Sequence, residues 1–200
     1  MADSRGPSSS HPEALGRLVD APWGTRVDKR RTVSLPLPDA SAWTQVRFYG
    51  VTTVVGFRYG DSHHAVAAVF AFDARGDASV DRCAARFAAW GRPRAKDFDL
   101  VVGDPRVETI AWGPKGEKAK IFVFDTIRRS IFGETTYAAA YAVYPAWKDA
   151  CLIVGMAAPD RDAGSAASTL RDRLVRDALP ALVVRPSAGA QALEAKIDFD

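Results

Sequence analysis

Short runs of apolar and β-branched residues, separated by glycine and proline, recur along most of the chain and predict β-strands. Thr44–Tyr49 alternates polar and apolar side chains, as in a strand with one buried face, and Ala65–Phe72 is an apolar run bounded by turn residues. Segments of the same character lie at residues 32–36, 51–59, 98–102, 107–112, 119–127, 137–143 and 151–157. Together they predict a mainly antiparallel sheet of about 6–8 strands.

The apolar spacing changes to a helical period in two segments. Over residues 79–91 apolar side chains recur at i, i+3, i+4 and i+7, with Ser79 placed to cap the first turn and Gly91 to end the last. A second segment with this period covers about residues 161–178 and stops before Pro180. We therefore expect two main helices.

The order of these elements predicts the fold class. Two runs of strands joined by short turns, each followed by one helix, favour a single α+β domain over strict βαβ alternation. Because Ile121–Phe124 is apolar at every position, we expect layers on both faces of the sheet. We place the domain at residues 30–185. Residues 1–29, rich in Ser, Pro, Gly and Ala with a short helical pattern around Pro12–Val19, are expected to form a flexible arm, and residues 186–200 a C-terminal tail.

This element order resembles that of the Mog1/PsbP-like α/β/α sandwich family. The similar stretch covers Thr32–Arg185. In it, Leu35-Pro36 lies at the start of the first hairpin, and Phe87–Phe98 leads out of the first helix. Members of this family are binding or scaffold proteins: a GTPase-binding factor, photosystem accessory subunits and adaptor chaperones for secreted effectors. The resemblance therefore implies a binding surface, and it assigns no individual site residue.

Composition and charge narrow the class of protein. Of 200 residues, 48% are hydrophobic and 26% charged, which is typical of a globular domain, and no apolar run approaches the roughly 18 residues of a membrane helix. Lys plus Arg number 27 against 24 Asp plus Glu, and the longest basic run is Lys29–Arg31, so we expect no nucleic-acid interface. The N-terminus lacks a signal-peptide pattern. A cytoplasmic location is the default, and a periplasmic or secreted one follows if a leader has been removed.

The chain contains two cysteines, Cys83 on the apolar face of the first predicted helix and Cys151 at the start of a late strand. Two interpretations stay open. We prefer the one in which both thiols are buried as small hydrophobic groups. In the other they form a disulfide that joins helix to sheet and implies an oxidising compartment. The sequence has no C-x-x-C motif and no Cys/His cluster, so structural zinc is not expected.

One cluster, Asp61-Ser62-His63-His64, has the composition of a catalytic site. His63 oriented by Asp61 could act as a general base, or the two imidazoles could bind a metal ion. Adjacent histidines at the start of a strand point to opposite faces, however, and a polar hairpin turn accounts for the same residues. The sequence also contains none of the phosphate-binding, nucleophile-elbow or zinc-protease motifs. We therefore predict no catalytic residue, metal or cofactor, and retain Asp61, His63 and His64 as candidates.

Aromatic residues provide the preferred candidate for a binding site. The chain has five tryptophans and five tyrosines, and Tyr144, Trp147 and Lys148 fall in a segment that the pattern assigns to a loop before Cys151. Exposed Trp and Tyr often anchor protein interfaces. We therefore predict that these three residues contribute to a binding surface.

The function that we expect is that of a non-enzymatic binding or accessory domain, which holds a protein partner or an apolar ligand on an aromatic surface. It rests on the missing catalytic motifs and on the element order. One alternative is a small hydrolase or metal-dependent enzyme centred on the Asp61–His64 turn. The other is an exported structural domain held by a Cys83–Cys151 disulfide.

Overall fold

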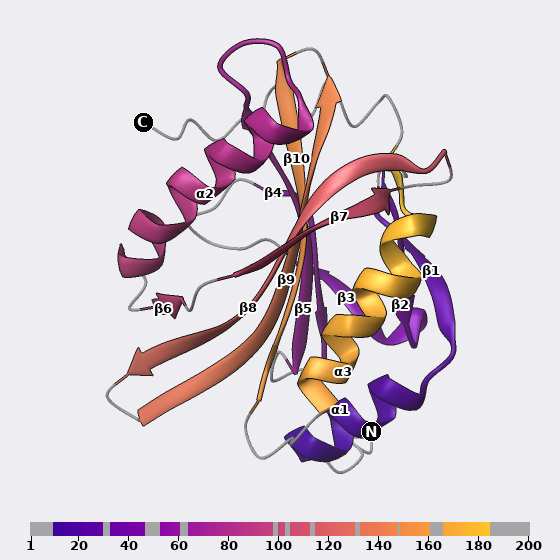
Figure 1. The fold of residues 1–200 in the computed structure, drawn as a ribbon. Coiled ribbons are helices and arrows are strands. Elements are labelled where there is room, and N and C mark those ends of the chain that lie inside the picture. Colours follow the sequence, from indigo (N-terminus) through magenta and orange to yellow (C-terminus); the bar gives the residue numbers. More distant parts are fainter. Residues whose placement is uncertain are drawn as a thin grey trace.

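The computed structural model (Figure 1) describes residues 10–29, 33–46, 53–60, 64–97, 100–102, 105–112, 115–130, 133–147, 149–160 and 166–184. In this part of the chain the elements form three layers. One helix covers one face of a large sheet. The other face is covered by two helices and a small sheet, which we call the second layer. Layers on both faces of the sheet were expected from the sequence, and the structure contains both. None of the described helices combines the length and the hydrophobicity needed to cross a membrane.

An eight-stranded sheet forms the central layer. Its strands are β3 (Trp43–Val46), β4 (Thr53–Tyr59), β5 (Ala65–Asp73), β6 (Leu100–Val102), β7 (Arg106–Trp112), β8 (Glu117–Ser130), β9 (Gly133–Trp147) and β10 (Ala150–Pro159). They pair in the order β3-β4-β5-β10-β9-β8-β6, with β7 also paired to β8, and every pair is antiparallel. The predicted fold class, an α+β domain on an antiparallel sheet of 6–8 strands, is confirmed.

Helix α2 (Val80–Asp97) covers one face of this sheet. Its buried residues Cys83 and Phe87 pack against Phe72 of β5 and Phe122 of β8. Since these side chains follow the helical period seen in the sequence, the apolar stripe of α2 is the surface that meets the sheet.

The start of α2 agrees with the prediction, and its end does not. The backbone N–H of Arg82 donates to Oγ of Ser79 at 3.2 Å, as an N-cap requires. The helix passes through Gly91 and continues to Asp97, so the expected end at residue 91 is wrong. A glycine inside a helix costs only about 1 kcal/mol relative to alanine, and packing of α2 on β6, β8 and β9 offsets that cost.

The second layer contains two helices and a three-stranded sheet. Its elements are α1 (His11–Asp20), α3 (Ala166–Arg173), the small strands β1 (Trp23–Val27), β2 (Val33–Pro38) and β11 (Val183–Val184), and a one-turn 3-10 helix, η1 (Ala40–Ala42). Helix α3 continues as a π-helical turn, η2 (Leu174–Ala178), and a 3-10 turn, η3 (Leu179–Ala181), which contains Pro180. The predicted second helix is thus present over residues 166–178, and residues 161–165 lie outside the described part.

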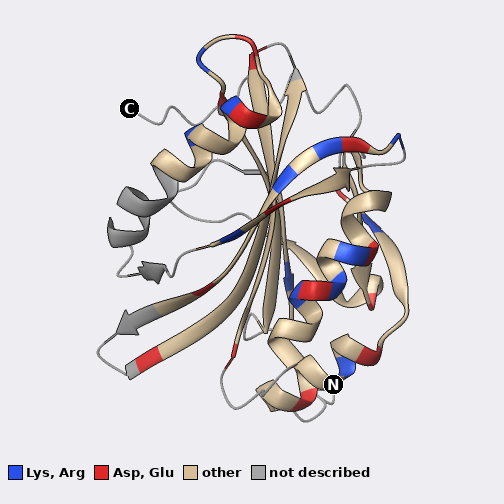
Figure 2. Ribbon diagram, viewed as in Figure 1, with Lys and Arg blue, Asp and Glu red and all other residues tan. Residues whose placement is uncertain are grey.

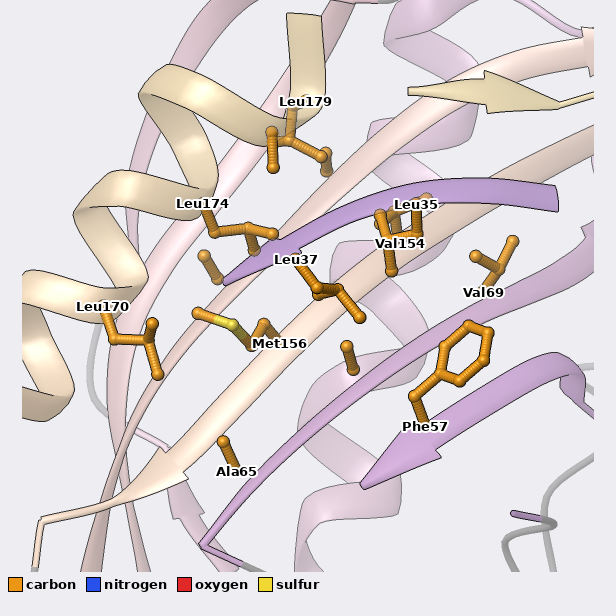
Figure 3. Packing of buried hydrophobic residues seen from close by; sticks show 14 of the residues in the cluster. Leu35, Leu37, Phe57, Ala65, Val69, Val154, Met156, Leu170, Leu174 and Leu179 are labelled. Atoms are coloured by element: carbon orange, nitrogen blue, oxygen red, sulfur yellow. The ribbon is translucent and has the colours of Figure 1, made fainter. Parts of the chain in front are cut away.

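Leucines of the second layer meet the central strands in one continuous core (Figure 3). The residues at its centre are at most 1% exposed and come from α3, η2, β2, β5 and β10: Leu170, Leu174, Leu35, Leu37, Val69, Val154 and Met156. Burying such side chains contributes about 1.5–3 kcal/mol each. The small sheet and α3 are therefore parts of the same folding unit as the large sheet.

Helix α1 corrects the expectation of a flexible arm over residues 1–29. Leu15 and Leu18 are fully buried, and α1 packs against α3. Arg173 of α3 donates to the carbonyl of Val19 and lies over the ring of Trp23 in β1, 5.2 Å from its centroid. Residues 11–27 are thus docked on the core. The predicted C-terminal tail, residues 186–200, lies outside the described residues.

We predict that Leu15→Ala lowers the free energy of unfolding by about 2–5 kcal/mol, because it leaves a cavity between α1 and the core. Urea denaturation followed by circular dichroism measures this change. Arg17→Ala, on the exposed side of the same helix, serves as the control and should stay within about 0.5 kcal/mol of the wild type. Equal stability of both variants would mean that α1 is undocked in solution.

Candidate functional site

Tyr144 lies on β9 at the end of the sheet that also carries the β7–β8 hairpin. Its ring stacks on Trp112 of β7, with centroids 4.8 Å apart and planes 11° from parallel. Trp112 is 3% exposed, whereas Tyr144 is half-buried. The tyrosine hydroxyl donates a short hydrogen bond to Oε2 of Glu117 on β8. One face of the tyrosine ring therefore covers a buried tryptophan, while the side chain as a whole is only partly buried.

The electrostatics of this position keep Tyr144 protonated. Burial raises the pKa of its phenol well above the usual range, and the hydrogen bond to Glu117 and the charge of that carboxylate raise the pKa further. At neutral pH the site thus offers an aromatic ring next to a carboxylate. That combination can bind a cationic or amphipathic group.

Two neighbours of Tyr144 were also predicted to bind. Trp147 is the last residue of β9, where it pairs with Ala150 of β10, so the predicted loop is wrong up to this point. The strand tolerates Pro145 because the register between β9 and β10 shifts at Ala150/Cys151, and proline occurs within sheets at such irregularities. The side chain of Trp147 and all of Lys148 lie outside the described residues.

The predicted histidine cluster is represented by His64, since Asp61 and His63 lie outside the described residues. His64 is 9% exposed, and its Nδ1 lies 2.8 Å from Nδ1 of His11 at the start of α1. Nε2 of His11 lies 2.7 Å from the carbonyl oxygen of Pro159, so it must carry a hydrogen and donate. In neutral His11 the Nδ1 then accepts the hydrogen bond that His64 Nδ1–H donates.

This histidine pair ties α1 to the start of β5 and the end of β10. The ring nitrogens of the pair hydrogen-bond to each other and to a backbone carbonyl. These bonds satisfy polar groups in a partly buried position, which is a structural role. Within the described residues no group of three or more His, Cys, Asp or Glu side chains is placed to hold a metal ion.

Cys83 of α2 and Cys151 of β10 form a disulfide in the structure, with both residues fully buried. Of the two interpretations that the sequence left open, the structure contains the bonded one. The bond joins the helical layer to a central strand across 68 positions of sequence. It lies inside the apolar cluster between α2 and the sheet, next to Phe72 and Ile153.

The same cluster contains an aromatic group that the sequence analysis did not single out. Tyr141 of β9 stacks on Phe124, with ring centroids 5.5 Å apart, and its ring centroid lies 5.7 Å from that of Phe87 of α2. Its ring lies over Gly155 of β10, where an added Cβ would come within 2.4 Å of Tyr141 Cε1. A glycine inside an otherwise apolar strand was the available signal, since it marks a close approach. Burial raises the pKa of Tyr141.

Acidic and basic residues are interspersed along the described part of the ribbon, without a segment of one sign (Figure 2). Along α3 and the turn after it, the guanidinium of Arg171 binds Asp125 of β8 at 2.8 Å, and Arg173 and Arg176 both contact Asp177. Such pairs contribute little to stability individually. The Arg171–Asp125 pair links α3 to β8, whereas the two pairs of Asp177 lie within α3 and η2.

Comparison with known proteins supports the fold and identifies no sequence family. No family model and no curated protein matches the sequence. Among solved structures, cyanobacterial PsbP (CyanoP) from Synechocystis sp. PCC 6803 matches with a TM-score of 0.51 and 11% identity over 92% of this chain and 97% of that one. LpqN of Mycobacterium tuberculosis, described as involved in cell envelope biogenesis, gives a TM-score of 0.48 and 12% identity over 89% and 99%.

The chain therefore has a PsbP-like α/β fold, as its element order had suggested. At 11% identity the match to CyanoP establishes the arrangement of helices and strands.

We predict that replacing both cysteines, Cys83→Ala together with Cys151→Ala, lowers the free energy of unfolding by about 2–5 kcal/mol, because the unfolded chain then regains the freedom that the crosslink removes. Urea denaturation measures the loss. In addition, alkylation of the unfolded wild type should leave its mass unchanged unless the protein is first reduced. Alkylation of both thiols without reduction would show that the disulfide does not form.

The raised phenol pKa values predict that stability falls in alkaline solution. Burial is the first cause of the raised pKa of Tyr59, Tyr141 and Tyr144, so the folded protein keeps phenolic protons that the unfolded chain loses above pH about 10. Their stabilising effect is complete below that pH and declines as the pH rises. Urea midpoints between pH 9 and 11 should therefore fall, and less steeply for Tyr141→Phe than for the wild type. Identical slopes would contradict the prediction.

Proposed function

We propose that this protein is a non-enzymatic binding or accessory domain, which holds a protein partner on an aromatic surface formed by Tyr144, Trp147 and Lys148. The observation that carries the proposal is the stack of Tyr144 on Trp112, because it orders one aromatic ring that is still partly exposed. A ring that is already ordered loses little side-chain freedom when a partner covers it. Tyrosine and tryptophan are the residues most often found as interface anchors.

The fold is consistent with this role. CyanoP, which shares the fold, is a cyanobacterial PsbP. The family that the element order of this chain resembles includes binding and accessory proteins. We extend that role to this chain as part of the proposal. The hydrolase alternative at Asp61, His63 and His64 has less support, because the imidazole of His64 is buried and its Nδ1 is engaged by His11.

We further propose that the protein works in an oxidising compartment, outside the cytoplasm. The support is the Cys83–Cys151 disulfide, since disulfides form and persist mainly in exported proteins. This favours a periplasmic or secreted location over the cytoplasmic default. Fractionation of the host cells, followed by alkylation of the protein in each fraction, tests the location and the state of the thiols together.

The binding function is tested by affinity capture from the native host, comparing the wild type with Tyr144→Ala. We expect one protein to be recovered near stoichiometry with the wild type and to be reduced at least tenfold with the variant, because the anchor ring is lost. Tyr137→Ala, an aromatic substitution at the other end of β9, is the matched control and should retain the partner. Circular dichroism confirms that both variants are folded.

Recovery of the same partner in equal amounts with all three proteins would place the binding surface elsewhere. Turnover of a generic ester or phosphate substrate that is abolished by His64→Ala would instead support the hydrolase alternative.

A further inference from the structure

Strand β7 forms an open edge of the large sheet. It pairs with β8 on one side, and among the described residues no strand pairs with its other side. Four consecutive residues, Arg106–Thr109, are exposed, and Val107, 48% exposed, is the most exposed large hydrophobic residue in the described part of the chain. An edge of this kind presents unpaired backbone N–H and C=O groups and can accept another strand.

The charges on β7 differ from those that protect an edge. Edges are often protected by charged side chains, lysines above all, and like charges that face each other across two copies oppose their pairing. Here Arg106 and Glu108 have opposite signs and flank Val107, and they lie on the same face of the strand because they are two residues apart. Their side chains are 67% and 47% exposed and form an ion pair with each other, Nε to Oε1, at 2.6 Å.

This arrangement is complementary to itself. When two β7 strands are placed antiparallel with Val107 opposite Val107, Arg106 of each copy faces Glu108 of the other. Opposite charges directly across an antiparallel pair are favourable, and like charges are unfavourable. The opposite edge strand, β3, has only four residues and carries neither lysine, arginine nor acidic residues.

The position of Val107 adds an apolar contact to the charge match. In the β7–β8 register Val107 is the neighbour of Phe122, which belongs to the apolar cluster beneath α2. Pairing at Val107 thus joins the apolar faces of two sheets at their edges. From these observations we propose that two copies of this chain associate through β7, antiparallel, with the twofold axis at Val107.

Charge reversal tests the pairing. Arg106→Glu leaves two carboxylates on the strand and Glu108→Arg leaves two guanidinium groups, so each variant alone should be monomeric where the wild type is dimeric, with dissociation constants raised at least tenfold. An equimolar mixture of the two variants should dimerise again, because each charge then faces its opposite. Sedimentation velocity at several concentrations measures all four samples.

The mixture separates contact between copies from contact within one copy. Each variant carries like charges inside its own strand, and mixing does not change that. A wild type that stays monomeric up to about 100 μM would overturn the proposal, because a dissociation constant above that concentration is too weak for a stable complex. So would a mixture that stays monomeric.

Crosslinking tests the register. A short bis-maleimide should join two copies of Val107→Cys, because these positions face each other across the axis. In Thr109→Cys, the control on the same face, the two thiols are separated by about 14 Å along the strands and should react far less. Equal crosslinking of both variants, or crosslinking of Thr109→Cys alone, would overturn the register. The Tyr144→Ala variant should dimerise like the wild type, which separates this proposal from the partner-binding function.

Discussion

The structure depends on one constraint, which is that its central strands are apolar on both faces. In β10, Cys151 and Ile153 face α2, while Leu152, Val154 and Met156 face the opposite layer, and all five are at most 2% exposed. Water on either face would cost about 25 cal/mol for each Å² of apolar surface. Both covering layers are therefore required, and the placement of α2 on one side and of α1, α3 and the small sheet on the other follows from this requirement.

Regular periodicity made most of the fold predictable. Most of the alternating and apolar runs correspond to strands of the large sheet, the run at residues 32–36 corresponds to β2 of the small sheet, and the helical stripe from Val80 to Phe87 corresponds to the first half of α2. A short helical pattern around Pro12–Val19 was noted, but its docking on the core was missed because the buried stripe of α1 consists of Ala14, Leu15 and Leu18, which spans barely more than one turn, and its flank is rich in serine and proline. Ser10 and Glu13 mark its start as a capping box, but a helix this short is stabilised mainly by packing, here against α3, and that packing cannot be read from the local sequence.

Single residues misled the prediction where tertiary contacts outweigh local preference. Gly91 was interpreted as the end of a helix and the segment that begins at Tyr144 as a loop, yet the helix continues through Gly91 and the strand continues to Trp147. The candidate site shows the same limit. Tyr144 could be selected from the sequence by its residue type. Its partner Trp112 belongs to β7, which comes close to β9 only because both strands pair with β8. The contact between His11 and His64 joins positions 53 residues apart, which no spacing rule connects.

The disulfide also changes what the polypeptide is as a covalent object. Because it joins positions 83 and 151, the intervening chain, which includes β6, β7, β8 and β9, is a closed ring with two linear extensions. Cleavage of any one peptide bond inside that ring leaves both fragments attached to each other. A protein with this topology can be nicked once between its middle strands and still remain a single molecule, with every strand of the large sheet held on the same covalent framework until the bond is reduced.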